Sequence, residues 1–208
     1  MKADKIIFAT GNADKMREIR MIMAELGLEI QSMREAGIEV DIVENGKTFE
    51  ENAMIKASAI AQELGKSGMQ AVVLADDSGL EIDYLNKAPG IYSARYMGED
   101  TPYSVKNASL LRQLEGVPDE KRTARFVCVI AAVFPDGRKC TIRATIEGRI
   151  GYEERGQNGF GYDPIFYLPE FGMYSAELAP EEKNRISHRG KALEEMKKVL
   201  KQAAEENV

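Results

Sequence analysis

Two long β-rich runs late in the chain, joined by a turn signal, most constrain the fold. ARFVCVIAAVF (residues 124–134) and KCTIRATIEGRI (139–150) are rich in β-branched and other apolar residues. Between them lies PDGR, in which Asp136-Gly137 is a dipeptide typical of hairpin turns. The sequence therefore predicts a long hairpin, so the fold must contain a sheet.

The first third of the chain alternates strand and helix patterns. Apolar residues at helical spacing predict a helix from Ala13 to Leu26, ended by Gly27. A second helix is predicted to run to about Leu64, because Thr48 is a plausible N-cap and Glu51 stands at the matching position of a capping box. Short apolar runs predict strands at residues 5–9 and 28–33.

The remaining patterns complete an α/β fold. AVVLADDSGLEIDYL (71–85) reads as strand, polar turn and strand, and further helices are predicted from Thr101 to Leu114 and after Ser187. Early alternation followed by a late hairpin predicts a mixed sheet with flanking helices. Polar clusters fall at strand ends, where ligand clefts form in such folds. We expect one domain over residues 1–208.

Composition and charge limit the classes of partner that we expect this chain to bind. The chain has 44% hydrophobic and 30% charged residues, with a net charge of −6 and basic residues scattered along it. This pattern does not favour binding of a nucleic-acid polymer, which requires a concentrated basic face. Asp4 and Lys5 interrupt any secretion-signal pattern, and no apolar run approaches the roughly 20 residues of a membrane helix. We expect a cytoplasmic protein that does not bind membranes.

The two cysteines, Cys128 and Cys140, belong to no CxxC or histidine-containing ligand cluster. They could pair across adjacent strands, but without a secretion signal a disulfide is disfavoured. We expect two reduced thiols in the core.

The strongest chemical signal is ADDSG (75–79), directly after an apolar run. Two adjacent acids at a buried strand end are costly unless a cation or solvent compensates their charge. Oxygen ligands favour Mg²⁺ or Mn²⁺, and Mg²⁺ commonly bridges carboxylates and substrate phosphates. Since neighbouring side chains on an extended chain point apart, we expect one of Asp76 and Asp77 to face the cleft and the other to brace the turn. Glu44, Glu50 or Glu51 could add a ligand, and a polar turn is the alternative.

TGNADK (10–15) ends the first predicted strand and raises two alternatives. It is either an ordinary strand-to-helix turn or a phosphate-binding loop. In the second case Gly11 lets the backbone approach the phosphates, Thr10 and Asn12 offer polar contacts, and Lys15 lies near the helix start. Gly46-Lys47-Thr48 is not a P-loop, because Asp41 stands where that motif needs glycine.

Two further clusters lie near the C-terminus. NGFGYDP (158–164) combines flexible glycines with flat aromatic rings and a carboxylate, as a pocket for a heterocycle requires, although core aromatics are equally compatible. KNRISHRGKA (183–192) holds the single histidine, His188. Lys183 and Arg189 could meet a phosphate or a base carbonyl, whereas a lone histidine is more often structural. No Ser-His-Asp triad is visible, which disfavours nucleophilic catalysis.

These blocks together resemble one family. TGNADK, TFEENAMIKA, ADDSGLEIDYLNKAPGIYSARY, NGFGYDPIF and KNRISHRGKAL follow in this order over nearly the whole chain. They are similar to the inosine triphosphatase family of nucleoside-triphosphate pyrophosphatases, also called Ham1- or RdgB-like. The resemblance implies an elongated α/β fold with two lobes around a central cleft, Mg²⁺ dependence (Mn²⁺ as a substitute) and a homodimer.

The resemblance also implies an activity and a set of site residues. Members hydrolyse dITP, ITP and XTP (or dXTP) to the monophosphate and pyrophosphate, which removes deaminated purines from the nucleotide pool. By similarity, Asp77 is the catalytic residue, and Asp77 with Glu44 binds the metal. The implied substrate contacts are Thr10, Gly11, Asn12, Ala13, Asp14, Lys15, Ser78, Phe160, Gly161, Tyr162, Asp163, Lys183, His188 and Arg189.

Two alternatives remain from the sequence. One is a Maf-like nucleotide pyrophosphatase with a different base preference, and the other is a non-catalytic nucleotide-binding protein. A poised carboxylate in ADDSG and the lysine of TGNADK favour an enzyme. Together with SHRGKA (187–192), they also favour a phosphate-binding role for TGNADK.

Overall fold

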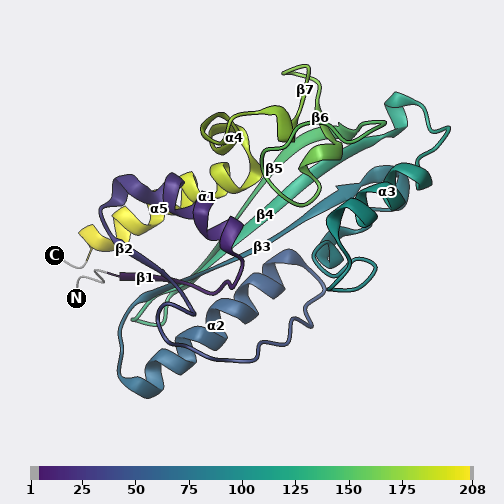
Figure 1. Ribbon diagram of the computed structural model, residues 1–208. Helices are drawn as coiled ribbons and strands as arrows, with labels where there is room; N and C mark the ends of the chain where they lie inside the picture. The colour runs from purple at the N-terminus through teal and green to yellow at the C-terminus, as the bar shows by residue number, and fades with distance from the viewer. Residues whose placement is uncertain (1–4, 207–208) are drawn as a thin grey trace. The chain divides into compact units, whose positions relative to one another are not determined.

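The computed structural model describes residues 5–206, whose strands form one mixed sheet in the order β2-β1-β3-β4-β5-β6-β7 (Figure 1). Strand β1 is parallel to both β2 and β3, whereas β6 is antiparallel to β5 and β7. The strands are β1 Lys5–Phe8, β2 Glu29–Ser32, β3 Val72–Ile82, β4 Thr123–Val133, β5 Lys139–Ile150, β6 Phe166–Leu168 and β7 Met173–Tyr174. The predicted mixed sheet and the hairpin of β4 and β5 are confirmed.

The helices also follow the predicted order. They are α1 Ala13–Met23, α2 Phe49–Ser67, α3 Tyr103–Gln113, α4 Pro180–Ile186 and α5 His188–Glu205. A short 3₁₀ turn extends α1 to Leu26, and Gly27 ends it with a left-handed φ of 62°. Helix α4 was not predicted, because its seven residues are too few to show a clear apolar period.

The start of α2 fulfils half of the predicted capping box. The Thr48 hydroxyl accepts the backbone N–H of Glu51 at 3.1 Å. The Glu51 carboxylate accepts the backbone N–H of Lys47 rather than that of Thr48. The loop before α2 is therefore attached to the first helical turn by two side chains.

The predicted strand–turn–strand pattern over residues 71–85 is wrong. Strand β3 continues through ADDSG without interruption. Polar side chains on a buried strand normally argue against such continuity, because each needs a compensating partner. Here Asp76 and Asp77 have such partners on the two faces of the strand, as described below.

The chain divides into two compact units. Unit 1 comprises, among the described residues, 5–77, 128–144 and 189–206, and unit 2 comprises 78–127 and 145–188. The expectation of one domain over 1–208 stays a prediction, as does that of a cleft between two lobes.

The core of unit 1 is built on alternate residues of its strands. Ile6 and Phe8 of β1 pack with residues of α1 and α5, such as Ile19 and Leu193. Figure 1 shows α1 and α5 on one face of the strands of this unit and α2 on the other. Small residues of α2, Ala53 and Ala57, are fully buried, which allows close approach of helix and sheet. Unit 1 is thus a three-layer α/β arrangement.

The core of unit 2 joins α3 to the distal parts of the long strands. Leu110 and Leu114 pack with Leu80 of β3, Phe126 of β4 and Phe166 of β6. Every one of these side chains is at most 8% exposed.

Two further expectations can be compared with the fold. Both cysteines are free thiols, with Cys128 buried and Cys140 half-buried. Within residues 5–206, no helix has the length and apolar character that a membrane crossing demands.

Candidate active site

The turn between β1 and α1 is held by its own side chains. The Asn12 side-chain oxygen accepts the backbone N–H groups of Asp14 (2.9 Å) and Lys15 (3.0 Å), and the Thr10 hydroxyl accepts that of Asn12 (3.2 Å). Asn12 is therefore the N-cap of α1. A Cβ added at Gly11 would meet no atom within 4 Å. Packing within the chain does not explain this glycine, whereas close approach of a ligand would.

Asp76 is the bracing member of the acidic pair. Its Oδ1 accepts from Lys15 Nζ at 2.5 Å, and its Oδ2 accepts from Arg189 Nε at 2.8 Å and contacts Cys128 Sγ at 3.3 Å. Asp76 is 1% exposed. Burial opposes its ionisation, but the Arg189 and Lys15 cations outweigh that penalty and hold the pKa of Asp76 well below its usual value. Asp76 thus fixes the ammonium group of Lys15 beside the β1–α1 turn.

Asp77 faces a different cation. Its Oδ1 accepts from Lys56 Nζ at 3.0 Å, and the same ammonium donates to Glu44 Oε2 at 2.9 Å. Asp77 and Glu44, which the family resemblance implies as metal ligands, therefore both accept from the same ammonium group. Asp76 and Asp77 thus have separate partners, as expected for neighbours on an extended strand, and the role of Asp77 toward a ligand stays a prediction.

The second oxygen of Asp77 is unusual. Asp77 is 7% exposed, and its Oδ2 has no hydrogen-bond partner among residues 5–206. Burial raises the pKa of Asp77 above its ordinary value, although Lys56 partly offsets the shift. A buried carboxylate oxygen without a partner costs about 1–3 kcal/mol, so it calls for a ligand or a water molecule. Such an oxygen can bind a cation or accept a proton.

The donor set suits a hard divalent cation. No group of three or more histidine, cysteine or acidic side chains among the described residues could enclose a metal ion. Mg²⁺, however, is typically held by one or two carboxylates, with waters and substrate phosphates completing its shell. Glu44 and the unpartnered oxygen of Asp77 fit that requirement.

Lys56 is the functional candidate that the sequence did not reveal. It lies on the buried face of α2 and is 9% exposed. Burial lowers the pKa of a lysine, but Asp77 and Glu44 raise the pKa of Lys56 above its ordinary value. The available signal was a charged residue within an otherwise apolar helical stripe, between Ala53 and Ala57.

In unit 2, Asp163 stabilises the loop NGFGYDP (residues 158–164), which we call the aromatic-glycine loop. Its Oδ2 accepts the backbone N–H of Phe160 (2.9 Å) and the ammonium of Lys183 (2.7 Å), and its Oδ1 accepts the hydroxyl of Ser175 (2.8 Å). A Cβ at Gly159 would lie 2.2 Å from the same carboxylate, so this position needs glycine. Asp163 and Lys183 therefore shape the loop from within.

The two aromatic residues of this loop differ in exposure. Tyr162 is 4% exposed, donates its hydroxyl to the Ser93 carbonyl at 2.7 Å, and meets the Tyr103 ring edge-on. Phe160 is half-buried, with Lys183 Nζ 5.2 Å from its ring centroid. Tyr162 is consequently a core residue whose ring is covered, and Phe160 retains the accessible ring surface.

The last cluster, SHRGKA, spans the boundary between the units. His188 in unit 2 is 6% exposed and stacks on Phe126 with ring centroids 4.9 Å apart. Arg189 in unit 1 is 2% exposed and pairs with Glu18 and Asp76. Both side chains have structural partners, and their substrate contacts stay predictions.

The other predicted contacts lie beside these groups in sequence. Ala13 is exposed in the first turn of α1, where Asp14 pairs with Arg17 at 3.0 Å. Ser78 follows Asp77 on β3 and is half-buried, like Gly161 in the aromatic-glycine loop. The structure thus brings Lys15 to Asp76 and Glu44 to Asp77 within unit 1, and Phe160 to Asp163 and Lys183 within unit 2.

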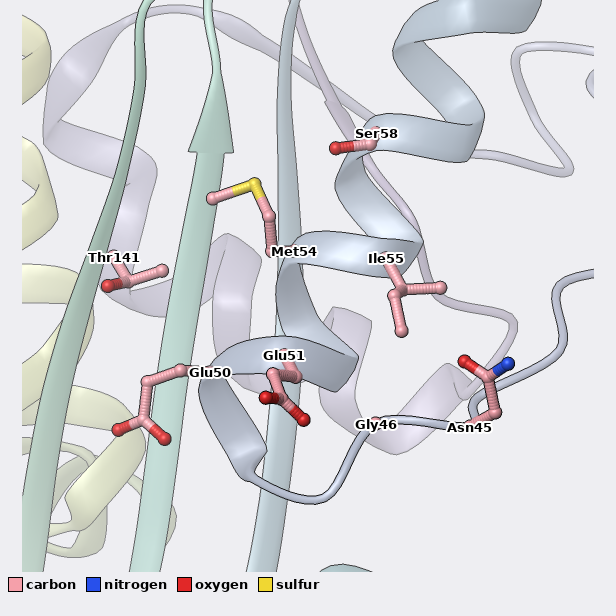
Figure 2. Close-up of a pocket in the computed structure, with 8 residues that line it drawn as sticks. All are labelled: Asn45, Gly46, Glu50, Glu51, Met54, Ile55, Ser58 and Thr141. Atoms are coloured by element: carbon pink, nitrogen blue, oxygen red, sulfur yellow. The ribbon is translucent and has the colours of Figure 1, made fainter.

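A surface depression of about 630 Å³ also lies on unit 1. Figure 2 shows the exposed side of α2 with Met54, Ile55 and Ser58 along it, and Thr141 across from them. It is lined by Asn45, Gly46, Glu50, Glu51, Met54, Ile55, Ser58 and Thr141. Glu50 and Glu51, two of the three glutamates considered above as metal ligands, line it, whereas Glu44, Lys56 and Asp77 do not.

The fold and these groups define a class. The chain is an α/β protein in which Asp76 and Asp77 of β3 bind Lys15 and Lys56, an arrangement suited to binding phosphates and a divalent cation. Comparison with known proteins gives the family. The model of the Ham1 family matches residues 6–199, and the chain belongs to this family.

Individual relatives are similar in sequence to this chain over nearly their full length. The chain is 50% identical over 198 residues to a dITP/XTP pyrophosphatase of Clostridium perfringens, covering 95% of this chain and 97% of the relative. A dITP/XTP pyrophosphatase of Geobacillus kaustophilus is 49% identical, with coverage of 91% and 90%. The solved structure of a HAM1 protein from Coxiella burnetii matches with a TM-score of 0.84 at 42% identity, covering 95% and 98%.

Proposed function

We propose that this protein hydrolyses the non-standard purine nucleoside triphosphates dITP, ITP and XTP (or dXTP) to the monophosphate and pyrophosphate. Relatives 45–50% identical to it carry the name dITP/XTP pyrophosphatase. The observation that carries the proposal is the Asp77–Lys56–Glu44 group, in which a buried carboxylate oxygen has no partner within residues 5–206.

The proposed reaction is in-line attack of water on the α-phosphorus. The new bond joins the water oxygen to the α-phosphorus, and the bond to the bridging oxygen breaks, so that pyrophosphate leaves. Asp77 orients the water and takes its proton, a role for which a raised pKa is suitable. Lys15 and Lys56 offset charge on the phosphates, because positioning and electrostatics dominate phosphoryl chemistry.

Asp77 and Glu44 are the proposed ligands of Mg²⁺, with Mn²⁺ as a substitute. When bound, such an ion would neutralise phosphate charge and orient the triphosphate. The loop of Thr10, Gly11, Asn12, Ala13 and Asp14 is assigned to the phosphates, and Ser78 to a neighbouring substrate contact. Open space at Gly11 supports backbone approach there.

Base recognition is assigned to the loop of residues 158–164 and to His188 and Arg189. Phe160, the more accessible ring, is the proposed stacking surface, and Gly161, Tyr162, Asp163 and Lys183 shape the loop around it. Hypoxanthine and xanthine carry a carbonyl at position 6 where adenine carries an amino group. His188 and Arg189 are the proposed donors to that carbonyl, and an amino group in its place could not accept from them, which would disfavour adenine by about 1–3 kcal/mol per lost hydrogen bond.

We also propose that the protein acts in the cytoplasm as a homodimer, with a small nucleotide as substrate rather than a nucleic-acid polymer. The net charge of −6 supports the absence of a polymer partner. Sedimentation of the purified chain tests the assembly: twice the mass of 23.1 kDa is expected, and the single mass would contradict it.

One assay tests the proposed activity. Pyrophosphate release is measured from dITP, XTP, dGTP, dATP and dTTP, with Mg²⁺ and with chelator. We expect release from dITP and XTP only when Mg²⁺ is present. Turnover confined to dTTP, or to UTP when it is added to the series, would favour a Maf-like enzyme. Binding of dITP without cleavage would favour a nucleotide-binding protein.

The Asp163→Asn variant tests the loop assignment. The substitution removes the charge that Lys183 pairs with and weakens the acceptor for the Phe160 N–H. We expect the KM for dITP to rise about tenfold or more, with kcat changed less, since the loop would act in binding rather than in the chemical step. Steady-state kinetics provides the measurement. An unchanged KM would contradict the assignment, and Asp136→Asn on the exposed β4–β5 turn is the control.

A further inference from the structure

A second buried polar atom without a partner lies on α2 in the same unit. Asn52 is 0% exposed, and its Nδ2 has no hydrogen-bond partner among the described residues. Among the described residues of unit 1, only this amide nitrogen and Asp77 Oδ2 are buried side-chain polar atoms without a hydrogen-bond partner. One is a donor and the other is an acceptor. Each costs free energy unless something outside the protein chain satisfies it.

The orientation of the Asn52 amide is fixed by its other end. Its Oδ1 accepts the backbone N–H of Gly46 at 2.9 Å. A backbone N–H can only donate, so the atom facing Gly46 must be the oxygen and the other must be the NH₂ group. The unpartnered atom is therefore a donor with two hydrogens.

The bond to Gly46 also ties down the loop that carries Glu44. A Cβ at Gly46 would lie 2.7 Å from Asn52 Oδ1 and 2.7 Å from Glu51 Cβ, so the loop lies directly against α2. Glu44 is two residues before Gly46 and contacts Lys56. Asn52 precedes Lys56 by one helical turn on the buried face of α2, where side chains at this spacing are neighbours.

We propose that Asn52 is a further substrate-binding residue, whose Nδ2 donates to a phosphate oxygen of the bound triphosphate. Phosphate oxygens only accept hydrogen bonds, so an unpartnered NH₂ group one helical turn before Lys56 is complementary to them. Its Oδ1 at the same time holds the Glu44 loop in place. This inference rests on the proposed function, since it names a contact of that same site.

The test uses inorganic pyrophosphate as the probe and does not depend on turnover. Asn52→Asp keeps an acceptor for the Gly46 N–H but replaces the donor by an anionic oxygen. We expect the affinity for pyrophosphate in the presence of Mg²⁺ to fall about tenfold or more, because a charge-assisted hydrogen bond is lost and repulsion is added. The affinity for Mn²⁺ alone, measured by electron paramagnetic resonance, should stay equal or increase.

Asn45→Asp is the matched control, because it makes the same charge change on an exposed side chain one residue before Gly46. Its pyrophosphate affinity should change less than about twofold, since exposed charges are screened. Equal losses in the two variants would overturn the proposal. A parallel loss of Mn²⁺ and pyrophosphate binding in Asn52→Asp would also overturn it, because it would indicate loop anchoring alone.

A second measurement uses the unaltered protein, so it holds even where Asn52→Asp fails to fold. The side-chain ¹⁵N–¹H₂ resonances of Asn52 should shift when Mg²⁺ and pyrophosphate are added. Absence of a shift at saturation, or absence of pyrophosphate binding, overturns the proposal. Hydrolysis of dITP by the same preparation is scored separately, so failure of the proposed function is distinguished from failure of this contact.

Discussion

Asp77→Asn is expected to lower kcat for dITP at least about 100-fold, with the fold intact. A positioned general base contributes typically 10²–10⁴-fold, and an amide cannot take a proton from water. The asparagine oxygen can still accept from Lys56, which lies 3.0 Å from Asp77 Oδ1, so local packing is retained. Steady-state kinetics and thermal unfolding on the same samples provide the two measurements.

The pH dependence sharpens this prediction. Burial raises the pKa of Asp77, so kcat/KM of the unaltered enzyme should rise with pH through an inflection above the ordinary value of 3.8. This rise of kcat/KM with pH should be absent in Asp77→Asn. Asp136→Asn, on the exposed β4–β5 turn, should retain both the kcat for dITP and the rise of kcat/KM with pH. A kcat of Asp77→Asn within a few-fold of the unaltered enzyme would contradict the role of Asp77.

Asp76→Asn is expected to destabilise the protein by about 3–5 kcal/mol, because removing a carboxylate from a buried group of ion pairs leaves part of the positive charge of Lys15 and Arg189 uncompensated. Arg189 is 2% exposed and loses one of its two carboxylates. For a chain of this size, the loss corresponds to a fall in Tm of roughly 6–20 °C. Urea unfolding at pH 7 measures it.

The sign of the pH effect on stability follows from the lowered pKa of Asp76. A carboxylate with a depressed folded-state pKa stabilises the fold above its unfolded pKa, near 3.8, and the stabilisation is lost as pH falls toward the folded value. The difference in stability between the unaltered protein and Asp76→Asn should therefore shrink below about pH 4. Glu63→Gln, which removes an exposed pair with Lys66, should cost less than about 0.5 kcal/mol. A cost below 1 kcal/mol for Asp76→Asn would contradict the bracing role.

Local patterns were sufficient to predict most of the fold. The helical period predicted α1, α2 and α5, and Asp136-Gly137 predicted the hairpin, because both signals depend on neighbours within a few residues. Strand β3 was predicted wrongly because its continuity depends on residues that are distant in the sequence. The partners that make a continuous acidic strand tolerable, such as Arg189 and Lys56, are 113 and 21 residues away in sequence.

The candidate site shows the same limit. Adjacent aspartates predicted two side chains that point apart, and Asp76 and Asp77 do have separate partners, whereas a ligand-facing role for Asp77 stays a prediction. Lys56 was not predicted, because its role depends on a carboxylate pair that only the fold assembles. In the aromatic-glycine loop the residue types did not distinguish an accessible ring from a core one, and Tyr162 is the buried one.

The proposed reaction cleaves the bond between the α- and β-phosphates of a deaminated purine nucleotide. Phosphorus NMR of a dITP reaction with Mg²⁺ tests it most directly, because it distinguishes the products of each cleavage. In ¹⁸O-labelled water we expect dIMP and pyrophosphate in equal amounts, with the ¹⁸O on the phosphate of dIMP. Formation of dIDP and phosphate, or intact dITP after prolonged incubation, would contradict it.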